Sequence, residues 1–169
     1  MSRSRPFAAS ASSSPPGSVV SRPGEGSLRV SVVRNPSLSA TQRRVAGSAG
    51  VGALLRRCGD TLGVGARREL TVLLTDDSEL RRLNKQFLGV DEATDVLAFP
   101  AGDDGRVGDI AISVERAMTQ NDSGAEEVRL LSVHGLLHCL GHDHASRDEA
   151  AAMTAATVQL LPDQSVPDL

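Results

Sequence analysis

Four histidines are crowded into one short run of this chain. His134, His138, His142 and His144 all lie in the segment HGLLHCLGHDH, and the rest of the sequence has no histidine. Histidine is the commonest metal-ligating side chain, and its imidazole loses its charge close to neutral pH. The clustering therefore indicates a metal site rather than four independent surface or core residues.

The spacing of the first pair suits a helix. His134 and His138 are four residues apart, which places both imidazoles on one helical face about one turn apart. Leucines and valines around them recur with helical period. Gly141 suits the left-handed conformation that ends many helices. If the helix ends there, His144 arrives from the following turn and closes a third side of one metal ion.

His142 is the alternative third ligand, because it lies four residues after His138 on a helix that continues through Gly141. Three ligands along a straight helix would span about 12 Å, which is too far for one ion. We therefore favour His144. Cys139 is a further candidate, but its side chain should point about 100° away from His138, so a buried thiol is the better interpretation.

The residue after the first histidine also limits the chemistry. Zinc metalloproteases place a general-base glutamate there, whereas this chain has Gly135. A site of three histidines without a fourth protein ligand leaves a position for water, which is typical of catalytic zinc. We expect metal-assisted hydrolysis of a bond other than a peptide bond.

Length and composition fit one globular domain in a reducing compartment. The chain has 169 residues, 40% of them hydrophobic, no Trp or Tyr, and a net charge of −3. RNA would therefore be held mainly by arginines and by shape, because few aromatic rings can stack on bases. Cys58 and Cys139 are expected to be free thiols. No segment has the length of apolar residues that a membrane span needs.

The first 27 residues differ in composition from the rest. They are rich in Ser, Pro, Gly and Ala and have few acids, so we expect a disordered extension. An organelle transit peptide is the alternative for this segment. We expect the hydrolase domain to span residues 28–161, with a short tail at 162–169, and a cytoplasmic location unless residues 1–27 act as a transit peptide.

Hydrophobic periodicity predicts an α+β domain. We expect strands at about 28–34, 70–74, 95–99 and 107–114, and helices at about 39–57, 77–87, 115–120, 124–140 and 147–161. In this interpretation Asp77 caps the second helix. About four strands would form a mixed sheet packed with four to five helices, and the three-histidine site would lie at the end of a central helix.

Three blocks of sequence resemble one known family. HGLLHCLGHDH resembles the H-G-x-x-H-x-x-G-x-D-H signature of the YbeY family of endoribonucleases, which act in rRNA maturation. LNKQFLGVDEATDVLAFP, residues 83–100, resembles the family's LN…D…TDVLSFP segment. VGDIAIS, residues 107–113, resembles its GDI-x-IS strand. The resemblance covers about residues 28–161.

The resemblance implies a specific function. It implies a single-strand-specific, zinc-dependent endoribonuclease that matures the 3′ end of 16S rRNA and takes part in ribosome quality control. One Zn²⁺ per chain would be held by His134, His138 and His144. The partners would be ribosomal RNA and the small ribosomal subunit, with neither DNA nor a membrane involved.

Two positions depart from the family pattern. Leu88 stands where members usually have an arginine linked to RNA processing, so Arg81, Arg82 or Arg106 would have to replace it. If no arginine replaces it, the alternative to an endoribonuclease is a zinc-stabilised ribosome assembly factor without cleavage activity. His142 stands where an aromatic residue is usual, and packing in the turn is favoured over a role as a proton shuttle. A metallohydrolase acting on another phosphoester or an amide is a third possibility.

Several polar residues in these blocks have structural as well as functional interpretations. Asp109 in a strand and Asp143 between two histidines could each orient a ligating imidazole, and Asp143 could instead serve as a base. Asn84 could bond its own loop, and Thr94 and Asp95 could be turn residues. We expect a structural role for each of them.

Overall fold

The computed structural model describes residues 27–65, 67–102 and 105–169. These residues form four strands and six helices, in the following order: β1 (Arg29–Arg34), α1 (Ala40–Ser48), α2 (Val51–Thr61), β2 (Glu69–Thr75), α3 (Asp77–Leu88), β3 (Val96–Pro100), β4 (Arg106–Ser113), α4 (Val114–Gln120), α5 (Gly124–Cys139) and α6 (Arg147–Leu160). The extension predicted for residues 1–27 lies outside the described residues, apart from Ser27. The predicted division into 28–161 and 162–169 stays a prediction.

The four strands form one mixed sheet in the order β1-β2-β4-β3. β1 pairs parallel with β2, and β2 pairs parallel with β4. β3 runs antiparallel to β4 at the other edge, with Leu97 opposite Ala111. The predicted α+β class with a mixed sheet is confirmed.

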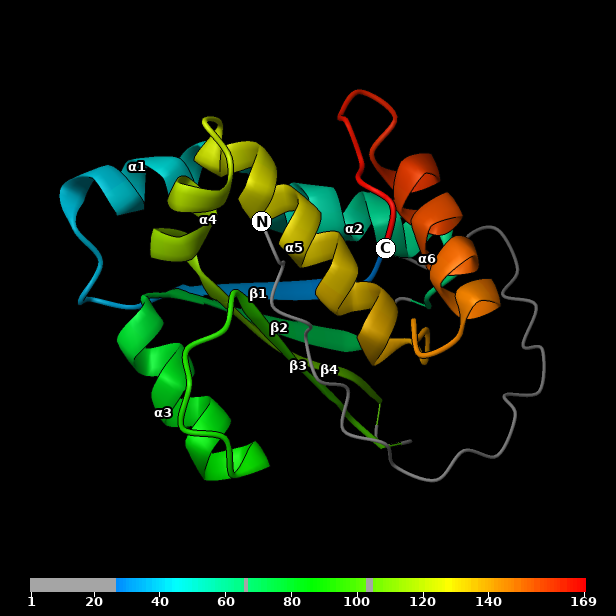
Figure 1. The fold of residues 1–169 in the computed structure, drawn as a ribbon. Helices are drawn as coiled ribbons and strands as arrows, with labels where there is room; N and C mark the ends of the chain where they lie inside the picture. Colours follow the sequence, from blue (N-terminus) through cyan, green and yellow to red (C-terminus); the bar gives the residue numbers. More distant parts are fainter. Residues whose placement is uncertain (1–26, 66, 103–104) are drawn as a thin grey trace.

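The helices cover the two faces of the sheet unequally. Figure 1 shows α5 crossing one face, with α1, α2, α4 and α6 on the same side and α3 on the other. The main core lies between the sheet and α2 and α5, and consists almost entirely of Leu, Val, Ile and Ala. A smaller cluster of Leu80, Leu97 and Ala111 lies under α3. Thus α5 is the central helix that the sequence predicts.

The single helix predicted between Ser39 and Arg57 is in fact two helices. Ser39 caps α1, in a capping box with Gln42. Gly50 then takes a left-handed conformation with φ of 59°, which ends α1 and turns the chain into α2. The described residues therefore form six helices.

The predicted cap of α3 is wrong by one residue. The side chain of Asp76, not that of Asp77, accepts a hydrogen bond from the backbone of Glu79. Asp77 instead binds Ser113 and Arg116, which connects α3 to the junction between β4 and α4. Sequence position alone could not distinguish two adjacent aspartates that can both cap a helix.

The local sequence determines both ends of α5. Ser123 caps its first turn. The carboxylates of Glu126 and Glu127 lie in the same turn, where they interact favourably with the positive end of the helix dipole. The helix ends at Cys139, and Gly141 follows with φ of 94°. Gly135 allows α5 to approach the sheet, because a Cβ there would lie 2.7 Å from Cγ2 of Ile110 on β4.

The chain folds back onto the domain after α6. Nε2 of Gln164 donates to the carbonyl of Glu126 on α5 at 2.7 Å, and the amide of Leu169 donates to Thr154 on α6 at 3.3 Å. The predicted tail is therefore attached to the helical layer. Within the described residues, no helix is long and apolar enough to cross a membrane.

Candidate metal centre

Three histidines converge where α5 ends. His134 and His138 project from successive turns of α5, and His144 comes from the loop that leads to α6. One ring nitrogen from each lies within 4.8 Å of the others. His142 is not part of this group, because α5 stops before Gly141 and the backbone amide of His142 donates to Leu137.

The spacing of the nitrogens fits a metal ion. Nε2 of His134 lies 3.1 Å from Nε2 of His138. Two nitrogens that each bind a tetrahedral zinc at about 2.0–2.1 Å would lie about 3.3 Å apart. Two imidazole nitrogens facing each other in a buried site must otherwise share a proton. The three rings also lie within ring contact of one another, with centroids 4.6 to 5.6 Å apart.

The surroundings of His134 and His138 keep these two imidazoles neutral. Burial, followed by the neighbouring His138 and His144, lowers the pKa of His134 to about 3. Burial and His144 also lower the pKa of His138. Because neutral imidazole is the form that binds a metal, both side chains are prepared as ligands at neutral pH.

Two polar atoms of the group need partners. Nδ1 of His138 and Nε2 of His144 are buried and have no hydrogen-bond partner among the described residues. A buried polar atom without a partner is unfavourable, and a metal ion would supply one for His144. The residues present therefore fit a metal ion, and this group could hold one.

The two aspartates near the histidines have structural roles. Oδ1 of Asp143 accepts a hydrogen bond from the backbone amide of His144 at 2.7 Å, so it orders the loop rather than an imidazole. Asp109 forms an ion pair with Arg106 and does not bind a histidine side chain. In the described part of the chain, neither carboxylate forms a hydrogen bond that would orient a ligating imidazole.

The other polar residues also have structural roles. Nδ2 of Asn84 donates to the carbonyl of Glu92, which confirms the predicted bond to its own loop. Asp95 accepts hydrogen bonds from Thr94, from the amide of Val96 and from Gln120. These contacts hold the turn that enters β3.

Cys139 is a core thiol, as predicted. It is buried, and burial followed by the charge of Asp109 raises its pKa to about 12. The packing around it depends on Gly108, which sequence analysis missed. Gly108 has φ of 154°, and a Cβ there would lie 2.8 Å from Sγ of Cys139. A glycine inside a strand is the available signal for such a close approach.

Comparison with known proteins agrees with this arrangement. The family model described as Endoribonuclease YbeY matches residues 40–164. The chain belongs to the YbeY family. Endoribonuclease YbeY of Bradyrhizobium diazoefficiens is 38% identical over 117 residues, which cover 61% of this chain and 64% of the relative. That of Koribacter versatilis is 51% identical over 82 residues, which cover 46% of this chain and 54% of the relative.

The chain therefore spans about half to two thirds of the length of these YbeY relatives. A Thermotoga maritima protein solved in solution has a similar fold, with a TM-score of 0.51 and 22% identity. The match covers 80% of this chain and 90% of that protein. At this identity the likeness supports the fold alone.

Leu88 occupies the position where YbeY sequences usually carry an arginine, and its surroundings are also apolar. Leu88, the last residue of α3, packs against the small cluster of Leu80, Leu97 and Ala111. The three candidate replacements are all paired: Arg81 with Asp91, Arg82 with Glu79, and Arg106 with Asp109. A replacement arginine would have to leave a carboxylate before binding RNA.

Proposed function

We propose that the chain is a zinc-dependent endoribonuclease that cuts single-stranded RNA. The observation that carries this proposal is the convergence of three histidines, two of them buried and held neutral, in a member of the YbeY family. Relatives that carry the name Endoribonuclease YbeY support the substrate class.

In this proposal His134, His138 and His144 hold one Zn²⁺ per chain. A zinc ion with an open position supplies Lewis-acid polarisation of a phosphodiester oxygen. The chain's own contribution is placement: α5 fixes two imidazoles, and Asp143 holds the backbone of His144. Gly135 offers no acid or base, so the residue after the first histidine cannot activate the attacking group, which in this proposal is a water or the 2′-hydroxyl of the RNA itself.

The proposed substrate is ribosomal RNA in the small subunit, at the 3′ end of 16S rRNA, with a role in ribosome quality control in the cytoplasm. The whole sequence has no Trp or Tyr and only three Phe. Stacking therefore contributes little to binding, and recognition depends on backbone contacts and on the shape of the RNA.

The direct test is metal-dependent cleavage of a 16S precursor fragment that includes the mature 3′ end. The purified chain with zinc should cut the fragment, and His138→Ala should lose both bound zinc and cleavage. His142→Ala is the matched control, because it removes a nearby histidine outside the group. Equal cleavage by the metal-free and zinc-loaded chain would overturn the proposal.

Leu88 favours a second candidate, a zinc-stabilised assembly factor that binds small-subunit particles without cutting. The apolar packing of Leu88 and the ion pairs of Arg81, Arg82 and Arg106 leave none of these positions free for phosphate. In that case the chain would bind zinc and co-sediment with small subunits, and single-turnover assays would show no cleavage.

A further inference from the structure

The net charge of −3 hides a strong separation of charge along the chain. Residues 27–68 contain eight arginines and one acid, Asp60, whereas residues 69–169 contain seven basic and nineteen acidic residues. The first group forms β1, α1, α2 and the turn before β2. The segment that forms β1, α1 and α2 is therefore strongly basic, although the protein as a whole is acidic.

The two groups of cations also differ in pairing. Five of the seven basic residues in the second group form ion pairs: Arg81, Arg82, Lys85, Arg106 and Arg116. In contrast, the four arginines of α1 and α2 form no ion pair with any described residue. They are Arg43, Arg44, Arg56 and Arg57, and all four are exposed. We call these four residues the arginine surface.

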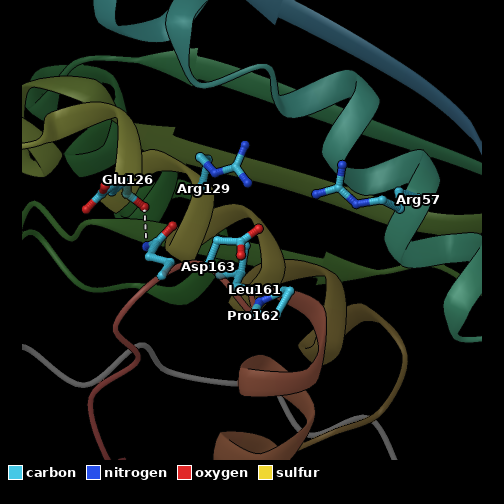
Figure 2. Close-up of a pocket in the computed structure, with 7 residues that line it drawn as sticks. Arg57, Glu126, Arg129, Leu161, Pro162 and Asp163 are labelled. Carbon is cyan, nitrogen blue, oxygen red and sulfur yellow. Dashed lines mark hydrogen bonds between the residues drawn. The ribbon is translucent and has the colours of Figure 1, made fainter.

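A pocket of about 430 Å³ is lined by Arg57, one of the four residues of the arginine surface. Figure 2 shows Arg57 reaching from α2 and Arg129 from α5 toward the same space, with Asp163 and the chain after α6 on the other side. Burial raises the pKa of the Cys58 thiol, and the positive charges of Arg57 and Arg129 offset part of this increase.

The arginines of the pocket are available to a ligand. The guanidinium of Arg57 has no hydrogen bond to a described residue, and that of Arg129 has only a long one of 3.4 Å to the carbonyl of Ala49. Glu126 and Asp163 line the same pocket, yet no ion pair within 4.0 Å joins either to an arginine in the described part of the chain. Gln164 also lines the pocket, and its Oε1 is buried without a hydrogen-bond partner in the described part of the chain.

We propose that the arginine surface, together with the pocket between Arg57 and Arg129, binds the phosphate backbone of RNA. The planar guanidinium fork suits phosphate, and every basic residue between 27 and 68 is an arginine. A protein partner fits less well, because interface cores need large apolar or aromatic anchors. The large exposed hydrophobic residues among the described ones all lie outside α1 and α2.

The relation to the metal centre defines the role of this surface. Arg129 and His134 lie on the same helix, five residues apart, which separates them by roughly 7.5 Å along the axis and about 140° around it. The pocket and the centre therefore open on different sides of α5. The arginine surface would hold RNA that flanks the cleaved bond, so it contributes affinity rather than chemistry. The choice of RNA as ligand rests on the proposed function.

The test is equilibrium binding of a fluorescent 20-nucleotide single-stranded RNA to the full chain between 50 and 300 mM KCl. Arg57→Gln with Arg129→Gln should weaken binding about tenfold at low salt and reduce the salt slope by about 1 to 2. Arg44→Gln with Arg56→Gln, which leaves the pocket intact, should act in the same direction. Denaturing gels confirm that the RNA stays whole, and circular dichroism confirms folding.

The matched control is Ala152→Glu with Ala155→Glu on the exposed face of α6, which changes the net charge by the same amount. Binding should change little in this control. An equal loss in the control, or unchanged binding in both arginine pairs, overturns the proposal. A third result would also overturn the proposal: the chain self-associates in a salt-dependent way, and the arginine substitutions abolish this association without affecting RNA binding. The arginine surface would then be a protein interface. Cleavage assayed in parallel separates the two ideas: arginine-dependent binding without cleavage supports the surface and contradicts the nuclease.

Discussion

Gly135 on α5 lies against Ile110 on β4 so closely that a Cβ at position 135 would be 2.7 Å from Cγ2 of Ile110. The same glycine directly follows His134. A glutamate at this position, which a zinc metalloprotease needs, would have no space between helix and sheet. The packing of the core therefore excludes the side chain that a zinc metalloprotease would need at this position.

Gly135→Ala should destabilise the domain by about 1–3 kcal/mol, because an inserted methyl in a tight core forces the backbone or its neighbours to move. Urea unfolding followed by circular dichroism measures the loss. Gly47→Ala on α1 is the matched control, since its Cβ would meet no atom within 4 Å. That change should be neutral or stabilising by up to about 1 kcal/mol. Equal effects of the two changes would contradict the packing argument.

His144→Ala should reduce zinc binding far more than His142→Ala. His144 supplies one of the three converging nitrogens, whereas the backbone of His142 is fixed by Leu137 outside the group. Competition with a chromophoric chelator gives the affinity, and elemental analysis gives the stoichiometry. Zinc should also raise the thermal midpoint of the parent chain and of His142→Ala, because a ligand that binds the folded state stabilises it. Loss of zinc from His142→Ala alone would make His142 the ligand.

The sequence predicted the helix of the metal centre well because its signals agree. The spacing of His134 and His138, the cap at Ser123 and the stop at Gly141 all favour one helix with one end. The break at Gly50 was missed, because three glycines, Gly47, Gly50 and Gly52, lie within this helical pattern and the sequence does not show which of them ends the first helix. The pocket between Arg57 and Arg129 was also missed, since it depends on how α2, α5 and the chain after α6 meet in space.

Asp77→Asn should cost about 1–2 kcal/mol near neutral pH, because Asp77 is partly buried and accepts charge-assisted hydrogen bonds from Arg116 and one from Ser113. Burial opposes ionisation of Asp77, but these hydrogen bonds outweigh it and lower its pKa below the usual 3.8. The stabilisation is therefore complete above about pH 4–5 and is lost as the pH falls through the lowered pKa.

Urea unfolding of the parent and of Asp77→Asn from pH 3 to 7 tests this dependence. The difference in the free energy of unfolding should be constant near neutrality and shrink in acid. Asp122→Asn is the control, because Asp122 is exposed and has no partner among the described residues. It should change stability by less than about 0.5 kcal/mol. If the difference in the free energy of unfolding between the parent and Asp77→Asn grows in acid, the hydrogen bonds of Asp77 do not stabilise the fold in the way described.

Neither cysteine should react with a thiol reagent while the chain is folded. Cys58 and Cys139 are both buried, and burial raises the pKa of each, that of Cys139 to about 12. The thiolate is the reactive form, so at pH 8 both thiols should stay unmodified in buffer and react rapidly in urea. Counting released chromophore with Ellman's reagent gives the result. One reactive thiol in the folded chain would show that the packing around α2 or the end of α5 opens.

Leu88→Arg should increase RNA cleavage by the zinc-loaded chain if the missing arginine limits its activity. Leu88 is only partly buried against the α3 cluster, so the aliphatic part of an arginine can keep this packing while the guanidinium reaches solvent. Leu88→Lys is the matched control: it adds the same charge without the planar fork that suits phosphate. Single-turnover cleavage of the 16S precursor fragment should rank Arg above Lys and Lys above Leu. Equal rates for all three would show that position 88 does not contact the substrate in this chain, and the other arginines of the fold would then have to supply that contact.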